Sequence, residues 1–141
     1  MHLRRIRWGA ALAAGVLAAL ATSGCSKLST PDGDRMDAIS VEIQNELLQR
    51  PDVVKAEVFY QDNVEASGTA SVSITVKPGA DFDPIVDETL RLIWQSKLGR
   101  LVVISVDLVD ADDIHRSISR SVILPEQKAE LERQYGPRPA Q

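Results

Sequence analysis

Residues 70–110 read ASVSITVKPGADFDPIVDETLRLIWQSKLGRLVVISVDLVD, and they hold the strongest structural signals of the chain. Its first and last segments, 70–76 and 102–108, place an apolar side chain at every second position, which is the pattern of a strand with one buried face. Between them, Asp83 followed by Pro84 is a helix start signal, and Gly99 is a natural helix stop. The stretch therefore predicts a strand, a helix and a second strand in that order.

Another helix and another strand precede this stretch. Apolar side chains recur at spacings of three and four residues in 36–47, which indicates an amphipathic helix. Asp34 could cap this helix, and Pro51 requires that it end earlier. Residues 54–61 then alternate apolar with polar side chains. Together, 54–61 and 69–77 predict an antiparallel hairpin with a long loop.

The order α-β-β-α-β predicts an α+β fold over 36–110, a two-layer αββαβ sandwich with a three-stranded sheet and two helices on one face. The other face of the sheet would stay open and polar, while the strand order is left undecided. That open side would carry Lys55, Glu57, Ser71, Ser73, Thr75, Ser105 and Asp107. Residues 111–141 are a polar C-terminal extension, in which LPEQKAELERQYG (124–136) could form a short helix.

The first 24 residues have the three parts of a secretory signal. Three arginines among the first seven residues form a basic start, residues 8–21 form an apolar run, and small residues lead to Cys25. The apolar run is shorter than the roughly 20 residues that a membrane-spanning helix needs. The sequence therefore predicts an exported protein from which 1–24 are removed as a signal peptide.

The residues Thr22-Ser23-Gly24-Cys25 resemble the bacterial lipobox, with cleavage between Gly24 and Cys25. Thr22 stands where lipoproteins have leucine or a similar aliphatic residue. The resemblance implies that Cys25 carries diacylglycerol and anchors the chain in the cell membrane or outer membrane, with its domain on the extracytoplasmic side. Residues 25–35 would be the acylated cysteine and a flexible tether. The alternative is an ordinary secreted protein with a free or buried cysteine.

Charge and composition argue against several classes of function for the chain that remains after removal of 1–24. The whole chain has a formal charge of −4, and loss of the three leader arginines takes it to −7 over 117 residues, a poor match for nucleic acid. If Cys25 is acylated, no cysteine remains for a disulfide, a metal or a nucleophile. His115 is then the sole histidine, and no serine stands in a G-x-S-x-G context. We expect neither an enzyme nor a cofactor.

Three features of the sequence each allow two interpretations, a binding role or a structural one. Carboxylates that could hold Ca²⁺ occur at Asp107, Asp110, Asp112 and Asp113, although the EF-hand glycine and terminal glutamate are missing and such residues often form a solvated turn. Trp94 either packs in or beside the core or anchors a partner. The segment YGPRPA (135–140) is either an irregular tail or an extended segment that docks on a partner.

Residues 70–110 also resemble the ring-building motif of type III secretion ring lipoproteins and the flagellar basal-body ring protein. The matching residues are Ala70-Ser71-Val72, Lys77-Pro78-Gly79, and Val106 with Asp107 or Asp110, preceded by a similar LLQRPDVVKAEVFY at 47–60. The resemblance covers roughly 36–110 and implies the αββαβ fold and lateral assembly. The secretion lipoproteins carry two such modules and often a C-terminal membrane helix, whereas this chain shows one module and no second apolar span.

These observations predict a lipid-anchored extracytoplasmic protein that acts as a protein-binding or assembly module of the cell envelope. Contact with a protein partner, or self-association, would use the polar sheet face, an exposed strand edge or the helix with Trp94. The candidate contact residues are Trp94, Ser71, Ser73 and Thr75. The alternative is a lipoprotein that binds or senses a small ligand or a divalent cation through the Asp107–Asp113 cluster.

Overall fold

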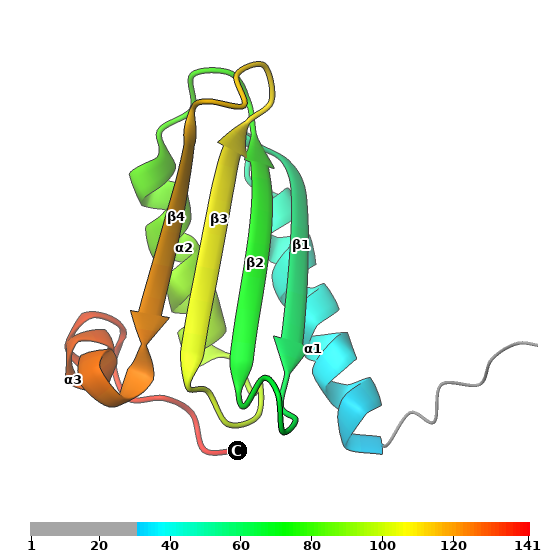
Figure 1. Cartoon of the computed structure of the whole chain (residues 1–141), viewed down its shortest axis with the longest axis vertical. Helices are drawn as coiled ribbons and strands as arrows, with labels where there is room; N and C mark the ends of the chain where they lie inside the picture. The colour runs from blue at the N-terminus through cyan, green and yellow to red at the C-terminus, as the bar shows by residue number, and fades with distance from the viewer. Residues whose placement is uncertain (1–30) are drawn as a thin grey trace, which may run out of the picture.

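The computed structural model describes residues 31–141, so the predicted leader, the lipobox and Cys25 lie outside the described residues. Within 31–141 the chain forms an α+β fold of three helices and four strands (Figure 1). In chain order these are α1 (Pro31–Leu48), β1 (Val53–Gln61), β2 (Thr69–Val76), α2 (Phe82–Gln95), β3 (Val103–Asp110), β4 (Ser117–Ile123) and α3 (Leu124–Tyr135). None of these described helices is long and apolar enough to span a membrane.

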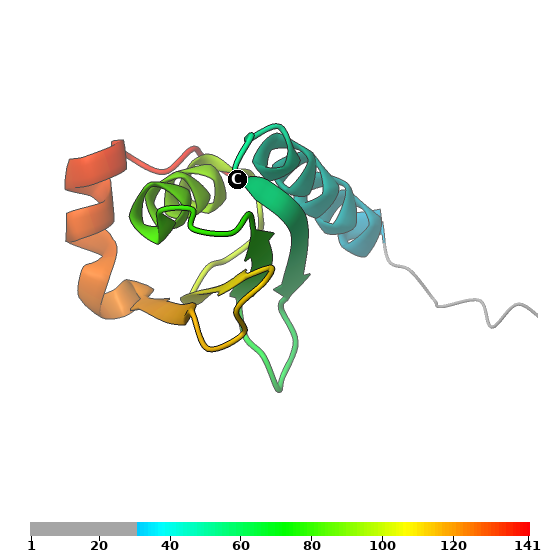
Figure 2. The same cartoon turned by 90° about the horizontal axis from the view of Figure 1, so that it is seen from above.

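The four strands form one mixed sheet in the order β1-β2-β3-β4. β1 and β2 pair antiparallel, as expected for the hairpin, whereas β2 and β3 pair parallel and β3 and β4 pair antiparallel. A parallel pair needs a crossover connection, and α2 supplies it between β2 and β3. Both α1 and α2 lie over the same face of the sheet, and no described element covers the opposite face (Figures 1 and 2). The predicted α+β class is confirmed, with these helices on one face.

The prediction of a three-stranded sheet is wrong, because β4 pairs with β3 as a fourth strand. β4 reads SISRSVI and lies in the segment that the sequence assigns to a polar extension. On its helix-facing side, Arg120 stands between Ile118 and Val122, so the apolar alternation is too short to predict a strand. Cross-strand hydrogen bonding to β3 decides the conformation instead. The short C-terminal helix that the sequence allows is present as α3.

Both helices of the helix layer begin earlier than their sequence signals indicate. α1 starts at Pro31, whose fixed φ suits the first helical turn, so Asp34 lies inside the helix and is not its cap. α2 starts at Phe82, and its N-cap is Asp81, whose Oδ1 accepts the backbone N–H of Asp83 at 3.2 Å. Carboxylates in both first turns complement the helix dipole. The early start of α1 shortens the tether predicted ahead of it.

A single apolar core lies between the sheet and the helix layer. Every second residue of β2 and β3 is buried, and these residues meet the apolar sides of α1 and α2. The largest side chains with almost no exposed surface are Trp94, Leu47, Ile74, Ile85, Ile93, Leu98, Ile104 and Leu108. Because the strands alternate with a period of two, this burial leaves their polar residues on the uncovered face.

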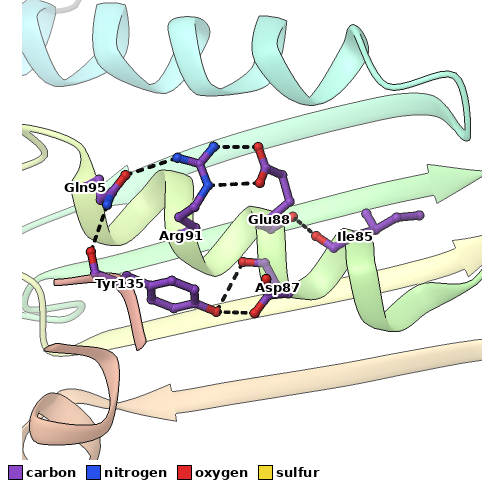
Figure 3. Close-up of polar contacts among 7 residues, drawn as sticks. Ile85, Asp87, Glu88, Arg91, Gln95 and Tyr135 are labelled. Atoms are coloured by element: carbon purple, nitrogen blue, oxygen red, sulfur yellow. Dashed lines mark hydrogen bonds and ion pairs between the residues drawn. The ribbon is translucent and has the colours of Figure 1, made fainter. Parts of the chain in front are cut away.

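The end of α3 is bonded to the outer side of α2 (Figure 3). The Tyr135 hydroxyl donates to Asp87 Oδ1 at 2.7 Å, and Gln95 Nε2 donates to the Tyr135 carbonyl at 2.9 Å. Arg91 positions the Gln95 amide through a 3.1 Å hydrogen bond and pairs with Glu88 at 2.7 Å. Burial and the Asp87 carboxylate raise the pKa of Tyr135.

The residues after α3 also pack on this domain. Trp94 Nε1 donates to the Gly136 carbonyl at 2.8 Å, and the Arg138 guanidinium donates to the carbonyls of Leu98 and Gly99. The segment YGPRPA thus has no regular secondary structure beyond Tyr135, as expected for a tail, but it is held against its own chain. The C-terminal segment therefore belongs to the folded domain.

Candidate interaction face

The uncovered side of the sheet gathers the side chains that point away from α1 and α2, and we call it the open face. Strand register aligns these residues in rows that cross the sheet. The rows are Gln61-Thr69-Val103-Ile123, Phe59-Ser71-Ser105-Ser121, Glu57-Ser73-Asp107-Ser119 and Lys55-Thr75-Val109-Ser117. The predicted contact residues Ser71, Ser73 and Thr75 therefore lie in three consecutive rows, on one of the two central strands.

Short hydroxyl side chains dominate the open face. Ser119 Oγ donates to Asp107 Oδ1 across β3 and β4, and on β1 Lys55 Nζ lies 2.9 Å from Glu57 Oε1. Between these groups the face is hollowed by about 260 Å³. Because a hydroxyl both donates and accepts hydrogen bonds, this surface can bond to donors and to acceptors of a partner. The arrangement provides recognition chemistry without a charged cluster of one sign.

Phe59 adds an apolar side chain to the open face. It is 60% exposed and stands opposite Ser71 in the strand register. An exposed aromatic side chain offers a large apolar contact area to a partner. The alternation of β1 places Phe59 on the same side as Lys55 and Glu57, but aromatic strand residues are usually core residues, so the pattern alone does not mark it as a contact residue.

Trp94 is not available to anchor a partner. Its side chain is 1% exposed, and α2 holds it in the core, on the opposite side of the sheet from the open face. Its polar atom is also satisfied, since the indole N–H donates to the Gly136 carbonyl. The structure therefore assigns Trp94 the first of the two roles considered for it, core packing, and the predicted interaction role is not supported by its position.

The four aspartates of the stretch VDLVDADDIH do not converge on one point. Asp107 lies on the open face, Asp110 is buried at the end of β3, and Asp112 and Asp113 are exposed in the β3–β4 loop. Among the residues described, no group of three or more His, Cys, Asp and Glu side chains is placed to hold a metal ion. The cation site considered at Asp107–Asp113 is therefore not assembled in the structure.

Asp110 instead joins the β3–β4 hairpin to the segment before α2. Its carboxylate accepts the backbone N–H groups of Gly79 at 2.9 Å and Asp112 at 3.0 Å, and a guanidinium N–H of Arg116 at 2.8 Å. Arg116 also lies over the Phe82 ring, 4.4 Å from its centroid. The hydrogen bonds from Gly79 and Asp112 lower the pKa of Asp110 to about 2. This carboxylate has a structural role.

The groove between α1 and α2 is a second hollow on the described surface, with a volume of about 730 Å³. Arg35, Glu42 and Glu46 line it from α1, and Arg91 and Lys97 line it from the α2 side. Arg91 is already bonded to Glu88. Because charges of both signs line the groove, it has no electrostatic preference for an anionic or a cationic ligand.

The two edge strands of the sheet are protected to different degrees. The pairing of β1 shifts register between Val53 and Lys55, an irregularity that hinders pairing with an additional strand. β4 pairs without such a shift, and α3 bonds only the backbone N–H of its last residue, since the Ile123 N–H donates to Gln127 Oε1 at 2.8 Å. In an antiparallel strand, the backbone N–H and C=O groups of every second residue point to the same side. The serines of β4 alternate in step with Ile123, so their N–H and C=O groups also point away from β3. β4 is therefore the more open edge.

Comparison with known proteins finds no matching family model, no matching curated protein and no matching solved structure. The resemblances to the lipobox and to the ring-building motif therefore stay predictions from the sequence. The open face and the β4 edge are the surfaces from which a function can be argued.

Proposed function

We propose that this protein is a lipid-anchored extracytoplasmic module that binds a protein partner, or a further copy of itself, in the cell envelope, and that it is not an enzyme. The observation that supports this proposal most strongly is the open face, where aligned hydroxyl side chains, Phe59 and the Lys55–Glu57 pair lie on an uncovered four-stranded sheet. The anchor is Cys25, as the lipobox resemblance implies. The acidic charge of the chain argues against a nucleic-acid partner.

The shape of the open face favours a macromolecular partner over a small ligand. Its hollow of about 260 Å³ is smaller than typical ligand pockets, which enclose roughly 300–1,000 Å³. Serine and threonine lose little rotamer entropy when they become ordered at an interface, whereas long charged side chains lose up to about 2 kcal/mol each. A flat array of short side chains is thus well suited to broad contact with another protein surface.

The size of the open face limits the area of that contact. With about 4.8 Å between strands and about 3.3 Å per residue over seven residues, the face of this four-stranded sheet measures about 450 Å² in projection. A standard interface buries about 800 Å² of accessible surface on each partner, and side chains that stand on a sheet expose more area than its flat projection. The open face is therefore near the small end of the size range of protein interfaces. Confinement of both partners to one membrane raises their effective concentration and compensates for the small area.

Two experiments test the proposal. The first is the intact mass of the chain from its native envelope, with Cys25→Ala as the control. We expect a chain that begins at Cys25 with a lipid-sized mass increment, and loss of that increment in the variant. An unmodified chain cut elsewhere would contradict the anchor.

The second experiment places a photo-crosslinking residue at Ser73, in the middle of the open face, or at Glu42 on the exposed side of α1 as the matched control. After illumination of intact cells, we expect a discrete crosslinked product from position 73 that is several times weaker from position 42. Mass spectrometry of the product distinguishes a second copy from another protein. Products of equal strength from both positions, or none from position 73, would contradict binding through the open face.

A further inference from the structure

One end of the domain gathers the start of α1 and two loops, and we call it the proximal end. Figure 1 shows it at the bottom, with the start of α1, the β1–β2 loop (62–68), the α2–β3 loop (96–102) and the C-terminus. The Tyr60 hydroxyl donates to the Arg100 carbonyl at 2.8 Å, and the Gly99 N–H contacts Met36 Sδ at 3.0 Å, so β1, the α2–β3 loop and α1 are tied together there. The β3–β4 loop (111–116) lies at the opposite, distal end.

The early start of α1 limits how far the proximal end can lie from the anchor. Six Cα-to-Cα steps separate Cys25 from Pro31, and a fully extended chain covers at most about 3.6 Å per step, or about 22 Å. The strands of the domain are themselves about 27 Å long, from eight residues at about 3.4 Å. Pro31, at the proximal end, is therefore held within a distance of the lipid that is shorter than the domain.

We propose that the proximal end faces the lipid surface, with the β1–β2 loop in contact with it, and that the distal end points away into the envelope. This inference deepens the proposed function and rests on the lipid anchor at Cys25. It assigns a lipid-facing surface to the domain, and it leaves the open face perpendicular to the membrane, where a neighbour in the same membrane can reach it.

The β1–β2 loop is built to hold an apolar side chain outward. Asn63 Oδ1 accepts the backbone N–H groups of Glu65 at 2.9 Å and Ala66 at 2.8 Å, which forms a local turn around Val64. Asp62 Oδ1 accepts the N–H of Gly68 at 3.1 Å and closes the loop. Val64, at the tip of this bonded turn, is fully exposed. An apolar side chain in that position can be buried among lipid headgroups without any change in the fold.

The proposed contact between the proximal end and the lipid surface does not depend on charge. Residues of both signs lie at the proximal end: Asp32, Asp34, Asp37, Asp62, Glu65, Arg35, Lys97, Arg100 and Arg138. Part of this charge is paired internally, as in Arg100–Asp62 at 3.5 Å. With no excess of cations, the proximal end has no electrostatic attraction to anionic lipids, so we expect its orientation to be insensitive to salt.

The test compares two matched positions at opposite ends of the sheet. Val64 and Ile114 are both exposed aliphatic loop residues, the first proximal and the second distal. In the full chain isolated with its lipid, the Cys25 sulfur is acylated, so Val64→Cys and Ile114→Cys each add the only free thiol for an environment-sensitive fluorophore. The labelled chains are reconstituted in phosphatidylcholine vesicles that contain a lipid with a nitroxide quencher on its headgroup.

We expect quenching at position 64 that is several times stronger than at position 114, at low and at high salt. As a control, about 20 Gly and Ser residues inserted before Pro31 add a flexible span of about 25 Å, and they should reduce this difference. Equal quenching at the two positions on a chain that floats with the vesicles would overturn the orientation but leave the anchor intact. A chain that carries no lipid and does not float would overturn both the anchor and this inference.

Discussion

Gly68 ends the β1–β2 loop at a point where the backbone leaves no room for a side chain. Its φ is +58°, and a Cβ added there would lie 2.4 Å from the carbonyl oxygen of Arg100. Its own carbonyl accepts the Val102 N–H at 2.7 Å, directly before Thr69 pairs with Val103 at the start of the parallel ladder. Gly68→Ala would therefore strain the backbone and force β2 and β3 apart where their pairing begins.

A matched glycine allows the magnitude to be estimated. Gly79 also has a positive φ, +77°, but nothing lies within 4 Å of a Cβ added there. Either replacement costs about 1–2 kcal/mol for the left-handed backbone, offset by about 0.4–1 kcal/mol because the unfolded chain is less flexible. At Gly68 a backbone atom blocks the new methyl group, and such overpacking adds about 1–3 kcal/mol. We expect losses of about 1 kcal/mol for Gly79→Ala and about 2–4 kcal/mol for Gly68→Ala.

The assay is urea denaturation of the purified chain, followed by far-UV circular dichroism for the wild type and both variants. The denaturation midpoint should fall slightly for Gly79→Ala and much further for Gly68→Ala, with an unchanged dependence of the free energy on urea. Equal losses at the two positions, or a larger loss at Gly79, would mean that the contact with the Arg100 carbonyl carries no cost.

Three further predictions concern Asp110, Trp94 and calcium. Because the pKa of Asp110 is lowered from 3.8 to about 2, this carboxylate contributes stability that is complete above about pH 4 and is lost as the pH falls toward 2. The melting temperature of Asp110→Asn should therefore vary less between pH 4 and pH 2 than that of the wild type. An identical pH profile of the two proteins would exclude a structural role of the Asp110 carboxylate. Trp94→Phe removes the indole donor to Gly136 and some buried surface, so we expect the free energy of unfolding to fall by about 1–2 kcal/mol and carboxypeptidase to trim 137–141 faster. Unchanged trimming would show that the Trp94–Gly136 hydrogen bond does not hold this segment. Millimolar Ca²⁺ should leave the melting temperature unchanged, and a clear rise would support the divalent-cation alternative.

The open face and the lipid anchor act together in the proposed function. A face of about 450 Å² in projection is small for an interface between proteins that diffuse freely in solution. An anchor with a short connection to α1 limits both the height and the orientation of the domain, so neighbouring copies or partners would meet it in a restricted set of poses. The orientation experiment and the crosslinking experiment therefore examine two parts of one mechanism.

Much of the open face could be predicted from the sequence. Ser71, Ser73 and Thr75 lie on one face because successive strand residues point to opposite sides, whatever the order of the strands. The same local rule places Phe59 there, but it does not say whether an aromatic side chain is covered by another element. Only the position of the helices shows that it is exposed.

Other features could not be predicted because they depend on contacts between distant residues. Trp94 has the same local pattern whether it fills the core or faces a partner, and its burial follows from the way α2 lies on the sheet. Asp110 reads as one of several acidic residues at the end of a strand. Its partner Gly79 is 31 residues away, and only the parallel alignment of β2 with β3 brings the two together.

Periodicities of two and of three to four residues record which side of each element is buried, so the sequence was enough to predict the α+β class, the hairpin of β1 and β2, and the polarity of the open face. Long-range packing set the strand order, the parallel pairing of β2 with β3 and the addition of β4, whose polar sequence becomes a strand because β3 offers its backbone hydrogen bonds. It also decided that α1, the β1–β2 loop and the C-terminal segment share one end of the domain. Local patterns encode burial within an element, whereas the arrangement of elements depends on packing between residues far apart in the chain.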